Sequence, residues 1–440
     1  MSSTLIRNAT ILTMNDRMEV VNGSVSVRDG RIASIGPESS GHHDVTIDAA
    51  GHLLLPGFIQ THLHLCQTLF RGYADDLRLL DWLRTRIWPM EAAHTASSLR
   101  AAARLACLEL LRSGTTSILT METVRGTDAV IDAVAETGMR ATIGKCLMDD
   151  TTADAPAGLR ENGRAALEES IALFRQYNGT ADGRIRVAFA PRFALSCSRE
   201  LLEAVAATAS ELKAIVHTHA SEQPDEVAMV RAATGTGNIE YFDRVGLMSP
   251  RLNIAHCVWV DETEQTLLAN GGAKVTHCPG SNLKLGSGIA PVPELRARGV
   301  SVSLGADGAA CNNHLDMFGE MRLAATLQSI RRSPGTLSAR DVLWMATRAG
   351  AAALGLEDEI GSIEAGKKAD LILVDTASSR LAPSPDPFSA LVYSAQASDV
   401  TMTMVGGEVL VQDGALLHLD SAEITAEARA EAAALARRAL

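Results

Sequence analysis

Between residues 57 and 363, short runs of β-branched and apolar residues alternate with longer amphipathic stretches. This alternation is typical of repeated βα units around a parallel sheet. We expect the eight strands to be the runs "GFIQTHLH", "TTSILTM", "MRATIGKCL", "RIRVAFAP", "AIVHTHAS", "LNIAHCVWV", "AKVTHCP" and "VSVSLGADG". Eight strands alternating with helices predict an α/β fold, a (β/α)8 barrel of the TIM type.

Two of the intervening helices have clear boundaries in the sequence. The segment "SSLRAAARLACLELLRSG" begins with serine caps and ends at Gly114. The segment "RELLEAVAATASELK" places Leu201, Leu202, Val205 and Leu212 at near-helical spacing. Both are expected to pack on the outside of the barrel.

The two ends of the chain differ from this pattern. Each contains alternating strands with a hairpin signal, at Asp29-Gly30 and at Gly406-Gly407. Neither end has enough strands for a stable sheet, so we expect them to pair into one small β-sandwich beside the barrel. The predicted domains are a β-sandwich of residues 1–56 and 364–440 and a catalytic barrel of residues 57–363. We expect the Ala-rich tail "AEITAEARAEAAALARRAL" to be a helix docked on the sandwich.

Composition and charge narrow the class of protein. The chain has 440 residues, of which 46% are hydrophobic, so it can bury a full core. Its start lacks the features of a secretory signal, and no apolar run reaches the roughly 18 residues that a membrane span needs. Seven cysteines without paired spacing indicate reduced thiols, and we expect a cytoplasmic protein.

The formal net charge of -12 comes from interspersed acidic residues. Such a chain is repelled by nucleic acid and by anionic membranes, so neither is expected as a partner. We expect a small-molecule substrate and a homo-oligomeric assembly.

Polar residues close several of the predicted barrel strands. His62 and His64 end the first strand, His219 the fifth, His256 the sixth and Asp307 the eighth. In a barrel of this kind the active site lies at the carboxyl ends of the strands. Because His62 and His64 are two residues apart on a strand, they point to the same side and can share one ion.

Each of these residues also has an ordinary interpretation. A buried histidine is usually hydrogen-bonded within the core, and an aspartate before glycine usually forms a turn. Their joint placement at strand ends favours a metal site instead. His62, His64, His219 and Asp307 form a plausible shell of three nitrogens and one oxygen for a single divalent ion, Zn²⁺ or Fe²⁺, with an open position for water.

Five longer segments resemble a known superfamily. They are "PGFIQTHLHLCQTLFRGYADDLRLLDWLRTRIWPMEA", "HTHASE", "AHCVW", "HCPGSNLKLGSGIAPVPEL" and "LGADGAACNNHLDMFGEMRLA". They are similar to the amidohydrolase superfamily, and more narrowly to its adenosine-type deaminases. That branch includes methylthioadenosine/S-adenosylhomocysteine deaminases, 5'-deoxyadenosine deaminases and the related s-triazine hydrolases. The similarity extends through "GSIEAGKKADLILVD" and covers nearly the whole chain.

The resemblance implies a role for each matching residue. The metal ligands would be His62, His64, His219 and Asp307. Glu222 matches the family's proton-shuttling glutamate and His256 its second catalytic histidine, whereas His217 is expected to be a supporting residue.

The resemblance also implies substrate contacts. Trp82 and Glu91 match positions that line the purine pocket and bind the ribose hydroxyls. Lys145 and Arg192 lie near positions where relatives place basic residues or histidine against the substrate. Trp82 and Glu91 belong to the long segment from Cys66 to Glu91, which we expect to be a lid or binding wall over the barrel mouth.

These roles imply hydrolytic deamination. A metal ion lowers the pKa of bound water from about 15.7 toward 7, which gives a nucleophile at neutral pH. Asp307 would accept the first proton. Glu222 would protonate the ring nitrogen and later assist the leaving amine, while His256 would hydrogen-bond the attacking oxygen.

The expected substrate is an adenine nucleoside, converted to the inosine-type product and ammonia. Lys145 and Cys311 stand where deaminases of S-adenosylhomocysteine are expected to carry Arg and Ser, which are better donors to a carboxylate. This favours 5'-deoxyadenosine, methylthioadenosine or adenosine, although Arg192 could still meet an anionic tail. Two alternatives stay open: a hydrolase of another N-heterocycle, such as guanine, a pterin or an s-triazine, and a non-catalytic scaffold relative.

Overall fold

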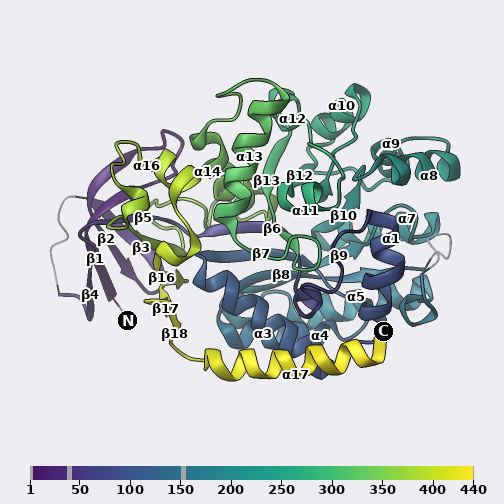
Figure 1. Ribbon diagram of the computed structural model, residues 1–440, viewed down its shortest axis with the longest axis horizontal. Coiled ribbons are helices and arrows are strands. Elements are labelled where there is room, and N and C mark those ends of the chain that lie inside the picture. The colour runs from purple at the N-terminus through teal and green to yellow at the C-terminus, as the bar shows by residue number, and fades with distance from the viewer. Residues whose placement is uncertain (1–2, 37–41, 150–154, 440) are drawn as a thin grey trace.

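The structure is a computed structural model that describes residues 3–36, 42–149 and 155–439. These residues form two nine-stranded sheets. Figure 1 shows one sheet surrounded by most of the helices and the other sheet at one side of the molecule. In the described part of the chain, no helix combines the length and the apolar character that crossing a bilayer requires.

The first sheet is a parallel barrel in the order β13-β12-β11-β10-β9-β8-β7-β6-β14. Its strands are β6 (Phe58–His64), β7 (Thr115–Met121), β8 (Arg140–Leu147), β9 (Ile185–Pro191), β10 (Val216–Ala220), β11 (Leu252–His256), β12 (Lys274–His277), β13 (Ser301–Leu304) and β14 (Asp307–Gly308). All eight predicted strands are present, so the predicted barrel is confirmed.

The barrel closes next to the histidines of β6. Only Gly305 and Ala306 separate β13 from β14, and β14 pairs in parallel with β6. Thr61 Oγ1 lies 2.7 Å from Ser303 Oγ, which joins the same two ends of the sheet. A Cβ atom on Gly305 would lie 2.7 Å from the carbonyl oxygen of His62, so this closure needs glycine.

Helices cover the outside of the barrel. They are α3 (Ala96–Arg112), α4 (Thr127–Thr137), α5 (Gly163–Tyr177), α7 (Arg199–Leu212), α8 (Pro224–Thr234), α9 (Asn238–Arg244), α10 (Glu262–Gly271), α11 (Pro279–Lys284), α12 (Val292–Ala297), α13 (Met317–Arg331), α14 (Ala339–Ala346) and α15 (Arg348–Ala353). The predicted start of α3 is slightly wrong, because its cap is Thr95, whose hydroxyl accepts from Ser98 N. For α7 the cap is Ser198, which accepts from Leu201 N.

The second sheet joins the two ends of the chain. Its strands are β1 (Ser3–Leu12), β2 (Val20–Arg28), β3 (Arg31–Gly36), β4 (Val45–Asp48), β5 (His52–Pro56), β15 (Leu371–Asp375), β16 (Val400–Val405), β17 (Glu408–Gln412) and β18 (Ala415–Leu416). Antiparallel pairing of β5 with β15 connects the N-terminal and C-terminal strands, as expected. Both predicted hairpins are present, between β2 and β3 and between β16 and β17. The domain boundaries at residues 57 and 363 stay predictions.

A buried ion pair links the two sheets. Arg140, at the start of β8, donates from Nε and Nη2 to the two carboxylate oxygens of Asp370, at 2.7 and 3.0 Å. Asp370 directly precedes β15 and also accepts from Gly406 N. Both side chains of the pair are buried, so this contact fixes the second sheet against the barrel.

The tail forms helix α17 (Ser421–Ala439), but its predicted docking on the sandwich is wrong. The helix runs along α3 on the barrel and also contacts α2 (Trp88–Ala92) (Figure 1). Arg104 of α3 donates to Glu427 at 2.6 Å. The buried side chains of α17 are Ile424, Ala428 and Leu435, which form its apolar face.

The long segment after β6 folds into short helices over the barrel mouth. These are η1 (Leu65–Phe70), α1 (Leu79–Trp82), η2 (Leu83–Ile87) and α2. We call residues 65–92 the lid segment. The remaining short helices are η3 (Ala157–Leu159), α6 (Thr180–Gly183), η4 (Ser379–Leu381), α16 (Pro387–Ser389), η5 (Ala390–Ser394) and η6 (Ala397–Asp399).

Candidate active site

Three histidines and one aspartate converge at the carboxyl end of the barrel. Asp307 Oδ1 lies 3.2 Å from His62 Nε2 and 3.3 Å from His64 Nε2. His219 Nε2 lies 3.3 Å from His64 Nε2. Residues from β6, β10 and β14, far apart in sequence, therefore present nitrogen and oxygen atoms to one small volume.

The opposite nitrogens of the histidines fix their tautomers. His64 Nδ1 donates to the carbonyl of Met121 at 2.7 Å, and His219 Nδ1 donates to that of Arg192 at 2.6 Å. A carbonyl only accepts, so the Nε2 atom of each ring keeps its lone pair. Such backbone partners are typical of histidines that bind metal.

His62 is oriented by a second histidine. His62 Nδ1 lies 2.7 Å from His217 Nε2, and His217 Nδ1 donates to the carbonyl of Asn253 at 3.3 Å. His217 Nε2 is then an acceptor, so His62 Nδ1 carries the hydrogen and His62 Nε2 faces the site with a lone pair. His217 thus lies behind the site and supports it.

The residues present fit a divalent metal ion. His62 Nε2 is buried and carries no hydrogen, so it makes no hydrogen bond to Asp307 Oδ1 although the two acceptors lie 3.2 Å apart. An ion bound between them would satisfy both atoms. Burial lowers the pKa of His62 to about 4 and holds the pKa of His219 well below its ordinary value. Burial opposes ionisation of Asp307, but His62 and His64 hold its pKa well below the ordinary range. Burial disfavours the charged form of His64, but Asp307 raises its pKa above the ordinary value. Three imidazoles beside a carboxylate are a donor set typical of Zn²⁺ sites.

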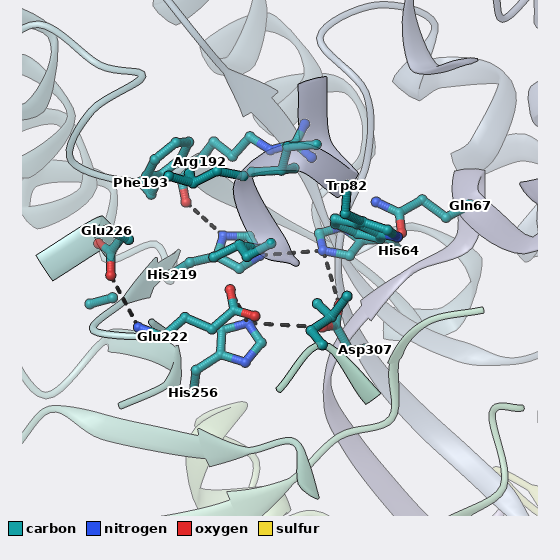
Figure 2. Close-up of a pocket in the computed structure, with 15 residues that line it drawn as sticks. His64, Gln67, Trp82, Arg192, Phe193, His219, Glu222, Glu226, His256 and Asp307 are labelled. Atoms are coloured by element: carbon teal, nitrogen blue, oxygen red, sulfur yellow. Dashed lines mark hydrogen bonds and ion pairs between the residues drawn. The ribbon is translucent and has the colours of Figure 1, made fainter. Parts of the chain in front are cut away.

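Glu222 and His256 lie beside His64, His219 and Asp307 (Figure 2). His256 Nε2 is 3.5 Å from Glu222 Oε2 and 3.9 Å from Asp307 Oδ2. His256 Nδ1 donates to Asn282 Oδ1 at 2.9 Å, which leaves Nε2 directed at the site. His256 and Asp307 both have left-handed backbone, with φ of 74° and 64°. Such conformations in residues other than glycine concentrate at functional sites.

A second buried acid, Glu226, accepts a hydrogen bond from the backbone of Glu222. Burial raises the pKa of Glu222 above its ordinary value, which favours the protonated form. Glu226 Oε2 accepts from the backbone nitrogen of Glu222 at 3.1 Å, and Glu226 also contacts Asn238. Burial raises the pKa of Glu226 to about 8. Ser287 donates to Glu222 Oε1 at 3.3 Å.

A pocket opens beside these residues. Its empty space, including the part open to solvent, is about 530 Å³. Its apolar wall consists of Leu79, Leu80, Trp82, Leu83, Phe193 and Leu285. Its polar lining consists of His64, Gln67, Arg192, His219, Glu222, Glu226, His256 and Asp307. Four residues of the apolar wall come from the lid segment, which therefore shapes this pocket.

Of the predicted substrate contacts, Trp82 and Arg192 line the pocket. Trp82 Nε1 is buried and has no partner in the described part of the chain. Glu91 is not among the lining residues, and its two oxygens accept from Arg192 at 2.5 and 3.1 Å. Gln67 Nε2 donates to the same carboxylate at 3.0 Å.

The structure keeps Lys145 away from the pocket lining. Its buried ammonium donates to both oxygens of Glu161, at 2.8 and 2.9 Å. Cys311 is also buried and directs its thiol to the carbonyl of Gly308 at 3.1 Å. Neither side chain is placed to meet a substrate in the pocket as it stands.

Several site residues were not predicted. Ser281 donates to Asp307 Oδ2 at 2.7 Å, and Asn282 holds His256. Both come just after the strand end "THCP", and their position at a strand end is a sequence signal for a site residue. Gln67 has a similar signal, because it comes three residues after the second histidine of the H-x-H pair. Glu226 has no such signal, since it resembles an ordinary acid in the first turn of a helix.

Comparison with known proteins agrees with this geometry. Residues 53–410 match the Amidohydrolase family. The chain is 43% identical to a 5'-deoxyadenosine deaminase of Methanothermobacter thermautotrophicus, over 98% of this chain and 99% of the relative. It is 39% identical to a 5-methylthioadenosine/S-adenosylhomocysteine deaminase of Pelotomaculum thermopropionicum, over the full length of both chains. A crystal structure of an adenosine deaminase from Xanthomonas campestris with bound zinc superposes with a TM-score of 0.93 at 33% identity, covering 99% of each chain.

Proposed function

The chain belongs to the amidohydrolase family, and from this premise we propose that it is a metal-dependent hydrolytic deaminase of an adenine nucleoside. Water replaces the 6-amino group, giving the inosine-type product and ammonia. The observation that carries the proposal is the convergence of His62, His64, His219 and Asp307 opposite the buried acid Glu222, at the edge of one pocket.

His62, His64, His219 and Asp307 would hold one divalent ion, and the donor set and the zinc-bound relative support Zn²⁺. The bound ion would supply the Lewis acidity that makes water nucleophilic at neutral pH. Asp307 accepts the first proton of the attacking water. Ser281 donates to Asp307 Oδ2 and so keeps that carboxylate oriented during the transfer.

Glu222 carries the proton that the ring needs. Attack at the ring carbon pushes charge onto the neighbouring ring nitrogen, which must be protonated as the tetrahedral centre forms. Burial raises the pKa of Glu222 and so favours the carboxylic acid that this step needs. The Glu222 carboxylate left by that transfer takes up the second proton of the attacking water and passes it to the leaving amine, and the proton held by Asp307 restores the Glu222 acid. His256 hydrogen-bonds the attacking oxygen and stabilises its charge.

The pocket wall supports a nucleoside with an uncharged 5' end. Trp82 and Phe193 offer aromatic surface to a flat purine. The one cationic side chain among the described lining residues, Arg192, is already paired bidentately with Glu91. Lys145 is paired with Glu161. A homocysteine carboxylate would therefore find no uncommitted cation among the described lining residues, so we propose 5'-deoxyadenosine, methylthioadenosine or adenosine as the substrate.

A steady-state panel tests this proposal. Ammonia release is measured with 5'-deoxyadenosine, methylthioadenosine, adenosine, S-adenosylhomocysteine, guanine, a pterin and an s-triazine. We expect turnover of the first three and a clearly lower kcat/KM for S-adenosylhomocysteine. Release of ammonia only from guanine, the pterin or the s-triazine would overturn the proposed substrate class.

The cellular setting follows from further observations. All seven cysteines are buried and free, which supports a reducing compartment such as the cytoplasm. We also propose a homo-oligomer, for which the exposed side chains of Trp259 and Ile330 are candidate contacts. Light scattering coupled to size exclusion tests the homo-oligomer, and a purely monomeric mass would contradict it.

A further inference from the structure

Glu320, in the first turn of α13, is a buried acid that lies outside the pocket lining. Both of its carboxylate oxygens accept hydrogen bonds. Oε2 accepts from the backbone nitrogen of Gly280 at 3.0 Å, and Oε1 accepts from Asn312 Nδ2 at 2.8 Å. A carboxylate is costly to bury, and here its two hydrogen bonds offset that cost.

These two contacts hold both ends of one hydrogen bond in the site. Gly280 directly precedes Ser281, whose hydroxyl donates to Asp307 Oδ2 at 2.7 Å. Asn312 Nδ2 also donates, at 2.8 Å, to the carbonyl of the residue directly before Asp307. Glu320 therefore links the segment that carries Ser281 to the segment that carries Asp307.

The packing around this carboxylate is tight. A Cβ atom on Gly280 would lie 2.4 Å from Glu320 Oε1 and 2.6 Å from Asn312 Oδ1, so this close approach needs glycine. Burial raises the pKa of Glu320 to about 7, whereas the hydrogen bonds from Gly280 and Asn312 favour its ionised form. Buried acids with a shifted pKa are concentrated at functional sites.

We propose that Glu320 is a positioning residue for the deamination, because it fixes the hydrogen bond from Ser281 to the carboxylate that accepts the proton of water. The inference rests on the proposed function. Asp307 Oδ1 lies beside His62 and His64, whereas Oδ2 accepts from Ser281. Glu320 thus acts on the oxygen farther from the two histidines, and its loss should affect turnover more than metal binding.

The variant Glu320→Gln keeps the shape of the side chain but places an amide NH₂ group against one of two N–H donors. Asn312 cannot turn its amide to compensate, because Nδ2 also donates to the carbonyl of Ala306. One of the two contacts is therefore lost. We expect kcat for 5'-deoxyadenosine at saturating zinc to fall by about tenfold, the lower end of the cost of losing an outer-shell partner, while KM changes by less than about threefold.

Glu264→Gln is the matched control. The two carboxylate oxygens of Glu264 also accept from nitrogen donors, Ile239 N at 3.1 Å and Asp261 N at 3.2 Å, and burial raises its pKa. Glu264 lies on α10 outside the pocket lining. This variant should keep the wild-type kcat, and urea unfolding checks that both variants are folded.

A double-mutant cycle with Ser281→Ala tests the route of the effect. Ser281→Ala removes the hydrogen bond through which Glu320 acts, so the two losses should not multiply. We expect kcat of the double variant to lie within about threefold of that of Ser281→Ala alone. Asn312→Ala, at a partly buried position, breaks the second contact of Glu320 and should show the same pattern, so the cycle can be run even if Glu320→Gln does not fold.

Three outcomes with an active wild-type enzyme would overturn the inference. They are a wild-type kcat in Glu320→Gln, an equal loss in Glu264→Gln, and losses that multiply fully in the cycle. A wild-type enzyme that releases no ammonia from any nucleoside would instead refute the proposed function, and the inference with it.

Discussion

Replacing Glu222 by Gln tests the proton transfer on which the mechanism depends. The two side chains have the same shape, so the amide oxygen of the variant can still accept from Ser287, and the backbone nitrogen can still donate to Glu226. The amide nitrogen also can still donate a hydrogen bond to a ring nitrogen. What the amide cannot do is give up a proton and take it back.

The size of the effect follows from this difference. Loss of a positioned general acid costs about 10²- to 10⁴-fold in rate, or roughly 3–5 kcal/mol of transition-state stabilisation. Because the ground-state contacts persist, we expect kcat to fall by that factor while KM changes by less than about threefold.

The assay is ammonia release from 5'-deoxyadenosine at saturating and limiting concentrations. Glu264→Gln is the matched control, since Glu264 is also a largely buried acid with a raised pKa but lies on α10 outside the pocket. It should keep the wild-type kcat. A wild-type kcat in Glu222→Gln would refute the assigned role, and so would an equal loss in both variants.

Three other perturbations address the metal site, the fold and a buried acid. Asp307→Ala should remove nearly all turnover. It should also lower zinc affinity by more than about 100-fold, because losing only an outer-shell partner of a metal ligand already costs up to about that factor. Activity and the zinc content after dialysis check this prediction. Arg140→Ala leaves Asp370 buried without its partner, so we expect the free energy of unfolding to fall by about 3–5 kcal/mol in urea titrations, while KM for the nucleoside stays unchanged. Burial raises the pKa of Glu226 from 4.5 to about 8. Between these two pH values the folded state holds a proton that the unfolded chain has lost. The contribution of Glu226 to the free energy of unfolding therefore falls as the pH rises from about 4.5 to about 8. The variant Glu226→Gln does not titrate at this position, so its unfolding free energy should rise relative to wild type between about pH 5 and pH 8, and a constant difference would contradict the assignment.

The barrel and the meeting of the four metal-binding residues could be predicted from the sequence for a physical reason. Buried parallel strands require continuous apolar runs, and their carboxyl ends all meet at one rim. His62, His64, His219 and Asp307 stand at such ends, so their meeting in space follows from the strand assignment alone.

The sequence does not predict which side chains of distant segments pair with each other. Glu91 and Arg192 are 101 positions apart, and only the folded lid brings them together. Lys145 likewise pairs with Glu161, which is 16 positions away. The apolar face of α17 predicts a docked helix, but Ile424, Ala428 and Leu435 match many apolar surfaces and do not specify α3.

The most direct test of the central claim is a zinc titration of chelator-treated enzyme, followed by ammonia release from 5'-deoxyadenosine. We predict no release before zinc is added, and a linear rise that saturates at one zinc ion per chain. Full activity without metal, or no release at any zinc concentration with all three proposed nucleosides, would contradict a metal-dependent adenine nucleoside deaminase at this site.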